Sequence, residues 1–263
     1  MSSSQLALIT GASSGIGAMY AKRLASRGYD LILVARDEKR LNALAQELQH
    51  AQGIKARVIA ADLTKPTDLQ RIEHELSSNS EITLFINNAG MSTAGRFLDS
   101  DISQVQTMLT LNIAVPTQLA YTAARAFRQR GTGSLVNIAS VMAFINETGN
   151  GAYNATKSFL LTLSQAMASE LSGSAVHVQA VLPGLTRTEI FERSGRSMAD
   201  LPTEMIMNVE DLVDAALNGL DRGESVTIPS LEESALWEDF EQQRRALHPY
   251  LSLNKPATRY QVK

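Results

Sequence analysis

The sequence predicts an α/β fold, a doubly wound and mostly parallel sheet of about seven strands with helices on both faces. Short apolar runs recur from the first residues to about position 230. Most of them are nearly continuous rather than alternating, which is typical of strands covered on both faces. The segments between them carry helical patterns, and this alternation implies right-handed crossovers. The expected strands are Leu6–Ile9, Leu31–Ala35, Val58–Ala60, Ile82–Ile86, Leu135–Ile138, Val176–Leu182 and Val226–Ile228.

Helix signals fill the intervals between these runs. Gly28 can end the helix after the first strand, Asp37 can cap the next helix, and Pro66 suits the first turn of the third. A last helix is expected over residues 232–247. Apolar residues at helical spacing support these helices: Leu41, Leu44, Ala45 and Leu48, then Leu69, Ile72 and Leu76, and later Val209, Leu212, Val213, Ala216 and Leu217.

Length and composition predict one domain. The chain has 263 residues, 44% of them apolar, which is enough for a single large core. No linker or internal repeat divides it, so residues 1–263 are expected to form one domain. Residues 186–207 break the rhythm of strands and helices and are expected to form a lid over a substrate. Residues 250–263 are expected to be an extended tail.

Composition also excludes several classes of protein. The 24 basic and 27 acidic residues give a net charge of −3, which excludes a strongly basic nucleic-acid binder. No apolar run reaches the ~18 residues that span a bilayer, and the N-terminus lacks the features of a secretory signal. Cysteine is absent and the four histidines lack ligand spacing. We therefore expect a cytoplasmic protein without a metal, nucleic-acid or membrane partner.

The first strand ends in a glycine-rich turn that opens a helix, TGASSGIG. Glycines let the backbone turn sharply and let a pyrophosphate approach the helix N-terminus, where unpaired amides and the helix dipole hold the anion. This position at the start of an alternating pattern predicts a dinucleotide site in a Rossmann fold. The residues expected to contact the dinucleotide there are Gly11, Ser13, Ser14, Gly15, Ile16 and Gly17.

The second strand ends at Ala35-Arg36, where an NAD site would place a carboxylate. Ala35 cannot bond a ribose hydroxyl, whereas the guanidinium of Arg36 suits a 2′-phosphate. The carboxylate of Asp37 is better explained as a helix cap. These residues predict NADP(H) rather than NAD(H). Polar or small residues also end the third and fourth strands, at Asp62-Leu63 and at Asn88-Ala89-Gly90, where ligands bind in such sheets.

A proton-transfer group is expected after the fifth strand. Ser140 follows that strand, and Tyr153 and Lys157 share one face of a helix, one turn apart. A free tyrosine titrates near pH ~10, and a neighbouring ammonium together with an oxidised nicotinamide would lower its pKa. The hydroxyl of Ser140 can bond a substrate oxygen as charge develops on it. An isolated YxxxK pair would be an ordinary helix surface; its position after the nucleotide turn makes it a catalytic candidate.

The sequence resembles the short-chain dehydrogenase/reductase family, in its short single-domain branch. The resemblance rests on TGASSGIG, NNAG, Asn112, Ser140, the YNATK pair and Pro183-Gly184, in this order over about the first 190 residues. It implies a single dinucleotide-binding and catalytic domain with a catalytic group of Asn112, Ser140, Tyr153 and Lys157. Tyr153 would be the general acid in reduction and the base in oxidation. Lys157 would bind the nicotinamide ribose, Ser140 would polarise the carbonyl, and Asn112 would hold a relay water.

The resemblance also implies cofactor contacts. Those residues are Asp62 and Leu63 beside the adenine, Asn88, Ala89 and Gly90 along the cofactor, and Pro183, Gly184, Thr186 and Thr188 near the nicotinamide. Thr186 departs from the family pattern, which has an aliphatic residue there. Ser14 stands where some NADP-using members have a basic residue, so Arg36 would read the phosphate mostly alone.

The expected activity is hydride transfer between NADP(H) and a carbonyl or secondary alcohol. Met142, Ala143, Phe144, Ile190 and the Met-rich insertion favour an apolar substrate. The alternative is a catalytically silent protein that senses NADP(H) and regulates a partner; lyase or epimerase chemistry is disfavoured because the chain lacks a sizeable substrate domain. Apolar residues on almost every side of the helix after Lys157, together with the family resemblance, favour a homodimer or homotetramer.

Overall fold

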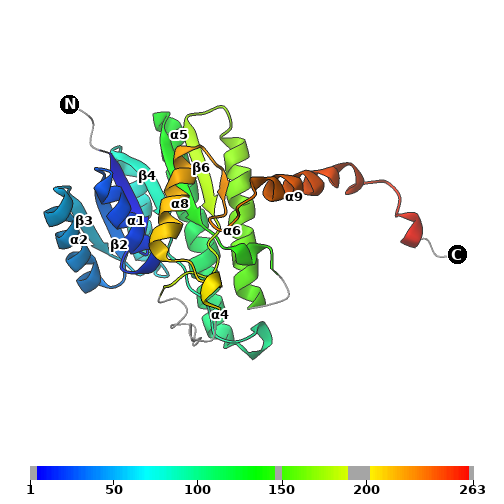
Figure 1. Cartoon of the computed structure of the whole chain (residues 1–263), viewed down its shortest axis with the longest axis horizontal. Coiled ribbons are helices and arrows are strands. Elements are labelled where there is room, and N and C mark those ends of the chain that lie inside the picture. The colour runs from blue at the N-terminus through cyan, green and yellow to red at the C-terminus, as the bar shows by residue number, and fades with distance from the viewer. Residues whose placement is uncertain (1–4, 146–149, 189–201, 261–263) are drawn as a thin grey trace. The chain divides into compact units, whose positions relative to one another are not determined.

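The computed structural model describes residues 5–145, 150–188 and 202–260 (Figure 1). Its internal contacts divide the chain into two compact units, Met1–Pro229 and Ser230–Lys263. The first unit contains the sheet and every residue expected at the site. The single domain expected from the sequence stays a prediction.

The first unit is built on a seven-stranded sheet with the order β3-β2-β1-β4-β5-β6-β7, and every pair is parallel. The doubly wound sheet predicted from the apolar runs is therefore confirmed. β1 pairs with both β2 and β4, so the chain changes direction across the sheet at this point. The strands are β1 (Leu6–Thr10), β2 (Asp30–Ala35), β3 (Ala56–Ala60), β4 (Ile82–Asn87), β5 (Gly133–Ile138), β6 (Val176–Val181) and β7 (Val226–Thr227).

Helices alternate with these strands (Figure 1). Asp37 caps α2 by accepting a hydrogen bond from the Arg40 amide, and Pro66 begins α3, as the sequence predicts. The helices of the first unit are α1 (Gly15–Ser26), α2 (Glu38–Gln52), α3 (Pro66–Ser78), α4 (Ile102–Leu109), α5 (Val115–Arg130), α6 (Gly151–Glu170) and α8 (Val209–Asp221). Short turns also occur at η1 (Phe97–Asp99), η3 (Val141–Ala143) and η5 (Thr203–Met205), and a π-helical turn, η2 (Thr110–Ala114), joins α4 to α5.

Successive strand residues point into two different cores. Ile9 and Leu33 belong to the core that contains apolar residues of α1, α2 and α8. Leu8 and Ile32, their neighbours in sequence, belong to the core under α3 and α5. Both faces of the sheet are therefore covered, which explains why the strands read as continuous apolar runs.

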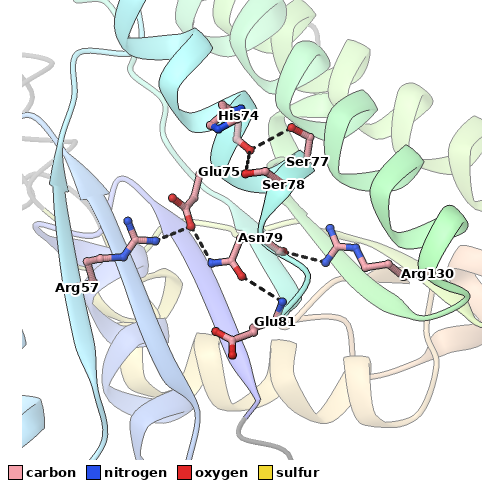
Figure 2. A network of polar contacts seen from close by, with 8 residues as sticks. All are labelled: Arg57, His74, Glu75, Ser77, Ser78, Asn79, Glu81 and Arg130. Atoms are coloured by element: carbon pink, nitrogen blue, oxygen red, sulfur yellow. Dashed lines mark hydrogen bonds and ion pairs between the residues drawn. The ribbon is translucent and has the colours of Figure 1, made fainter.

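A polar network lies at the amino-terminal edge of the sheet, opposite the edge where the parallel strands end (Figure 2). Glu75 of α3 accepts hydrogen bonds from Arg57 of β3 and from the Asn79 amide. Asn79 in turn accepts from the Glu81 backbone, and Arg130 donates to the Asn79 carbonyl. These bonds tie the end of α3 to the start of β4 and leave the carboxyl edge to the site.

The second unit contains α9 (Ser234–Ala246), followed by the turns η6 (His248–Tyr250) and η7 (Thr258–Tyr260). The expected last helix over 232–247 is confirmed to within two residues at its start. Residues 250–260 of the expected tail are exposed. Within the part of the chain that the structure describes, none of the helices combines the length and apolar character that crossing a bilayer requires.

Candidate active site

The carboxyl ends of the central strands carry the expected site residues. β1 ends at Thr10 beside β4, whose Asn87 is in register with Asn137 of β5. The side chains of Asn87 and Asn137 are hydrogen-bonded at 2.9 Å, and Asn137 donates onward to Ser164 of α6. This buried polar chain fixes the strand ends against the helix that carries Tyr153. Ligands bind at such an edge because the chain switches sides there.

The turn between β1 and α1 has space only for glycine. Gly11 and Gly15 have φ angles of +67° and +54°, which favour glycine. Gly17 has no such angle, but a Cβ atom there would collide with the Gly11 carbonyl oxygen and with the Asn88 amide. The first turn of α1 thus lies directly against the loop that follows β1.

Asn88 holds this turn from the neighbouring strand end. Its amide donates to the carbonyl oxygens of Thr10 (2.9 Å) and Gly11 (3.3 Å). The hydroxyl of Thr10 accepts from the backbone amides of Asn88 and Ala89. The sequence suggested Asn88 only as a cofactor contact; the structure shows that its side chain shapes the glycine turn.

The N-terminus of α1 has the features of an anion site. Ser14 is its N-cap residue, yet the Ser14 side chain makes no capping hydrogen bond, and the first turn contains no acidic residue. Amides of an uncapped first turn and the helix dipole attract phosphate groups. The methyl group of Thr188 would lie 3.3 Å from a Cβ at Gly15, so the segment after β6 reaches this turn.

The ends of β2 and β3 bring Arg36 close to Asp62. Arg36 is exposed, whereas Leu63 is buried. Hydrogen bonds from Thr64, together with the positive charges of Arg36 and Lys65, hold the pKa of Asp62 below its usual range. The guanidinium and the carboxylate therefore lie at the same corner of the sheet.

Ser140, Tyr153 and Lys157 come together beyond β5. Ser140 donates to the Pro183 carbonyl (3.3 Å) and accepts from the Met142 amide. Its hydrogen bond with Tyr153 favours the phenolate. Lys157 donates to the Ile138 carbonyl at 2.8 Å, and its Nζ lies 5.7 Å from the centre of the Tyr153 ring. The three side chains predicted from the sequence form one cluster, in which Ser140 and Lys157 are buried and Tyr153 is half-buried.

The pKa values of this cluster differ from expectation. Burial raises the pKa of Tyr153 to about 12, while the interaction with the Ser140 side chain acts in the opposite direction. Burial lowers the pKa of Lys157 to about 8. In the chain by itself, desolvation therefore outweighs the expected effect of the ammonium, and the phenol keeps its proton at neutral pH.

Asn112 lies in the π-helical turn between α4 and α5. Its side chain is paired with both backbone groups of Met91, at 2.9 and 2.8 Å, and it donates to Thr156 at 3.2 Å. A Cβ at Gly90 would lie 3.2 Å from the side-chain oxygen Oδ1 of Asn112 and 3.9 Å from the Lys157 ammonium. Gly90, Asn112 and Lys157 thus meet at one place, and π-turns of this kind are frequent at functional sites.

The segment after β6 closes the cluster on another side. Pro183 accepts from Ser140 and from the Val141 amide. Thr186 is buried, and its hydroxyl donates to the Gly184 carbonyl at 3.0 Å. The hydroxyl of this unusual threonine thus has a nearby backbone carbonyl as its hydrogen-bond acceptor. Residues 189–201 of the expected lid, including Ile190, lie outside the described residues; residue 186 forms a parallel bridge with Met207.

Two further residues of the site were not found from the sequence. Asn150 accepts hydrogen bonds from the first amides of α6, including that of Tyr153. Thr156 donates to the Tyr153 carbonyl at 2.7 Å. An asparagine at the start of a helix is a recognisable N-cap signal. Nothing in the sequence, however, indicates the other hydrogen-bond partners of Asn150. Among the described residues, no group of His, Cys, Asp or Glu could hold a metal ion.

Comparisons with known proteins match the fold described above. The family model for short chain dehydrogenase matches residues 5–199. A short-chain dehydrogenase from Sphingobium yanoikuyae in complex with NADPH is 47% identical, with 98% of this chain and all of that chain covered at a TM-score of 0.95. A bulky-bulky ketone specific alcohol dehydrogenase from Comamonas testosteroni is 43% identical, with 98% and 99% covered at a TM-score of 0.90.

A curated relative is more distant. The 7beta-hydroxysteroid dehydrogenase of Collinsella aerofaciens is 25% identical over 221 residues, which cover 83% of this chain and 84% of that protein. Relatives that process different alcohols and ketones therefore share the architecture described above.

Proposed function

Because the chain belongs to the short-chain dehydrogenase/reductase family, an oxidoreductase family, we propose that it transfers a hydride between NADP(H) and a carbonyl or secondary alcohol. The observation that carries this proposal is the cluster of Ser140, Tyr153 and Lys157 at the same carboxyl edge of the sheet as the glycine turn. A proton donor next to a dinucleotide cradle is what carbonyl reduction requires.

The residues around the glycine turn and Arg36 suit a dinucleotide with a 2′-phosphate, NADP(H). The space at Gly17 and the uncapped first turn of α1 would receive the pyrophosphate. Arg36 would bind the 2′-phosphate, at the corner where Asp62 and Leu63 would flank the adenine. The NADPH complex of the Sphingobium protein supports this preference. Asn88, Ala89 and Gly90 would line the middle of the cofactor, and Pro183, Gly184, Thr186 and Thr188 its nicotinamide end.

The protein would supply the proton and the orientation of the substrate. When bound, the nicotinamide donates or accepts the hydride. In reduction, Tyr153 gives its phenolic proton to the substrate oxygen while Ser140 hydrogen-bonds that oxygen. Lys157 binds the nicotinamide ribose and stabilises the phenolate left behind. The backbone around Asn112 holds a water through which solvent returns the proton.

The pKa of Tyr153 determines which protonation state begins each direction of the reaction. A phenol with a pKa of about 12 stays protonated at neutral pH and so begins reduction in the correct state. In oxidation the same group must lose its proton, and the positive charge of the oxidised nicotinamide would lower its pKa.

We further propose an apolar ketone of some bulk as the substrate. Met142, Ala143 and Phe144 follow Ser140 after one intervening residue, Val141, and are only partly buried. Ser158 of α6 holds the Ala143 carbonyl at 2.8 Å, which fixes this apolar turn beside the proton donor. The ketone specificity named for the Comamonas relative supports the same class.

A panel of ketones and alcohols, assayed with each of NADPH, NADH, NADP⁺ and NAD⁺, tests the function. We expect turnover of bulky apolar ketones with NADPH and slower turnover with NADH. NADPH binding, measured by its fluorescence, without turnover on any carbonyl would overturn the enzymatic proposal and favour the sensing protein. Faster turnover with NADH would overturn the assignment of Arg36.

A further inference from the structure

One buried side chain at the start of α6 is not used by the chemistry above. Asn150 is 4% exposed and is the N-cap residue of the helix that carries Tyr153. Its Oδ1 atom accepts hydrogen bonds from the backbone amides of Ala152 (3.0 Å) and Tyr153 (3.3 Å). This half of the side chain would be explained by helix capping alone.

The other half of Asn150 binds a different part of the chain. Its Nδ2 atom donates to the Thr93 hydroxyl (3.0 Å), the Gly95 carbonyl (3.2 Å) and the Ser100 hydroxyl (2.9 Å). Two amide hydrogens serve these three acceptors, so at least one of the bonds is shared. Thr93 is itself buried, and Ser100 folds back onto the carbonyls of Ala94 and Arg96. The side-chain amide of Asn150 thus binds three residues within the segment 93–100.

A second set of bonds joins the same region to the other side of Tyr153. Asn112 is paired with the backbone of Met91 and donates to Thr156, which donates to the Tyr153 carbonyl. The amide of Tyr153 is held through Asn150, and its carbonyl through Thr156. Both peptide groups of the proton donor are therefore anchored to residues 91–100, which follow directly from the Asn88-Ala89-Gly90 segment.

We propose that Asn150 is a positioning residue that sets the Tyr153 phenol against the cofactor by tying residues 93–100 to the start of α6. The proposal rests on the proposed function, because it assumes that Tyr153 is the proton donor. Asn150 acts through Tyr153 and does not touch the reactants. Asparagine suits both tasks because its side chain has an acceptor for the helix amides and a donor for the loop.

The substitution Asn150→Ser separates the two tasks. Serine is a good N-cap residue, so the helix start is kept, but its short hydroxyl cannot reach the three acceptors of residues 93–100. We expect kcat to fall about 10- to 100-fold, because small misplacements of a catalytic group have effects of this size. The KM for NADPH should change little. The solvent isotope effect on kcat should increase, because proton transfer from a misplaced phenol becomes more rate-limiting.

A merely structural role predicts a different outcome. Loss of folded protein would lower the measured kcat in proportion to the active fraction and leave the solvent isotope effect unchanged. Asn79→Ala is the matched control: it removes a half-buried side-chain amide at the amino-terminal edge of the sheet, which is hydrogen-bonded to Glu75 and Glu81. We expect it to lower stability without changing the isotope effect. An Asn150→Ser enzyme with wild-type kcat and isotope effect would overturn the proposal.

Hydrogen exchange gives a readout that does not depend on turnover. In Asn150→Ser, amides of residues 93–100 should exchange at least about tenfold faster, while those of α6 after its first turn should be unchanged. Unchanged exchange in residues 93–100 would contradict the tie. If the wild-type protein reduces no carbonyl while exchange responds as expected, the proposed function fails and the structural link stands. The two failures can thus be told apart.

Discussion

At the scale of single residues, burial is the dominant influence on the candidate site. Lys157 is buried and Tyr153 is half-buried, and desolvation shifts the pKa of each in the direction that favours its neutral form. A buried ammonium weakens the fold unless its partners compensate fully. The ammonium donates a hydrogen bond to the Ile138 carbonyl and lies 5.7 Å from the centre of the Tyr153 ring, and keeping such a buried cation indicates a functional rather than a stabilising role.

We predict that Lys157→Met makes the protein more stable at pH 7. A pKa lowered from 10.5 to about 8 means that the buried ammonium destabilises the fold by about 3 kcal/mol, which the variant would regain. The variant also loses a hydrogen bond that contributes about 1 kcal/mol, so its free energy of unfolding should be higher by about 2 kcal/mol. Between pH 8 and pH 10.5 the folded wild type binds fewer protons than its unfolded chain, so the stability of the wild type rises with pH across this range. The stability advantage of Lys157→Met should therefore shrink over the same range. Urea denaturation at several pH values measures this. A variant less stable than wild type at pH 7 would contradict the account.

Arg36 is predicted to decide between the two dinucleotides. Arg36→Asp should weaken NADPH binding by about 100-fold, because it replaces a phosphate partner with a repelling charge, and should change NADH binding far less. Fluorescence titration of both cofactors measures the difference. Lys39→Asp makes the same charge change nearby on exposed α2 and should affect the two alike. Equal losses for both cofactors in Arg36→Asp would remove Arg36 from the phosphate site.

At the scale of elements, the site depends on close packing between the ends of β1 and β4 and the start of α1. Asn88 donates two hydrogen bonds to Thr10 across the strand ends, and Gly17 allows the helix to approach. The glycine turn is therefore a joint product of three elements. This explains why the motif is read so well from the sequence while its supporting bonds are not.

Gly17→Ala should disrupt this junction. The added Cβ would collide with the Gly11 carbonyl and the Asn88 amide, and backbone can yield only by moving the helix. We expect NADPH affinity to fall at least about tenfold and the midpoint of thermal unfolding to decrease. Gly151→Ala, where a Cβ meets nothing within 4 Å, should leave both quantities near wild type. Tight NADPH binding by Gly17→Ala would show that the turn tolerates a shifted helix.

Much of this was predictable from local patterns, and the remainder was not for definable reasons. Continuous apolar strands, the cap at Asp37 and the spacing of Tyr153 and Lys157 are local signals that the structure confirms. The links from Asn150 to Thr93 and Ser100 join residues about 50 positions apart, which no local pattern encodes. The effect of burial on the Tyr153 pKa could not be predicted from the sequence either, because desolvation depends on packing from every side.

At the scale of the whole molecule, α6 links the site to the expected assembly. One side of the helix is buried through Leu160, Leu161 and Ser164, while Phe159 is 39% exposed. A helix that is apolar on its exposed side suits a subunit interface. A homodimer or homotetramer formed through α6 stays a prediction from the sequence.

Phe159→Glu tests that prediction. A carboxylate in an apolar interface should dissociate the oligomer, which light scattering after size-exclusion chromatography would detect as a lower mass. Leu98→Glu makes a comparable change at a residue that is 91% exposed on η1, and should leave the mass unchanged. An unaltered mass in Phe159→Glu would place any interface elsewhere.

The most direct test of the central claim is a single-turnover measurement with Tyr153→Phe. Enzyme saturated with NADPH is mixed with a ketone that the wild type reduces, and the loss of NADPH absorbance gives the rate of hydride transfer. We predict a rate at least about 100-fold below wild type, because the general acid is gone, with an unchanged Kd for NADPH. A rate close to wild type would show that the proton comes from another group and would contradict the account.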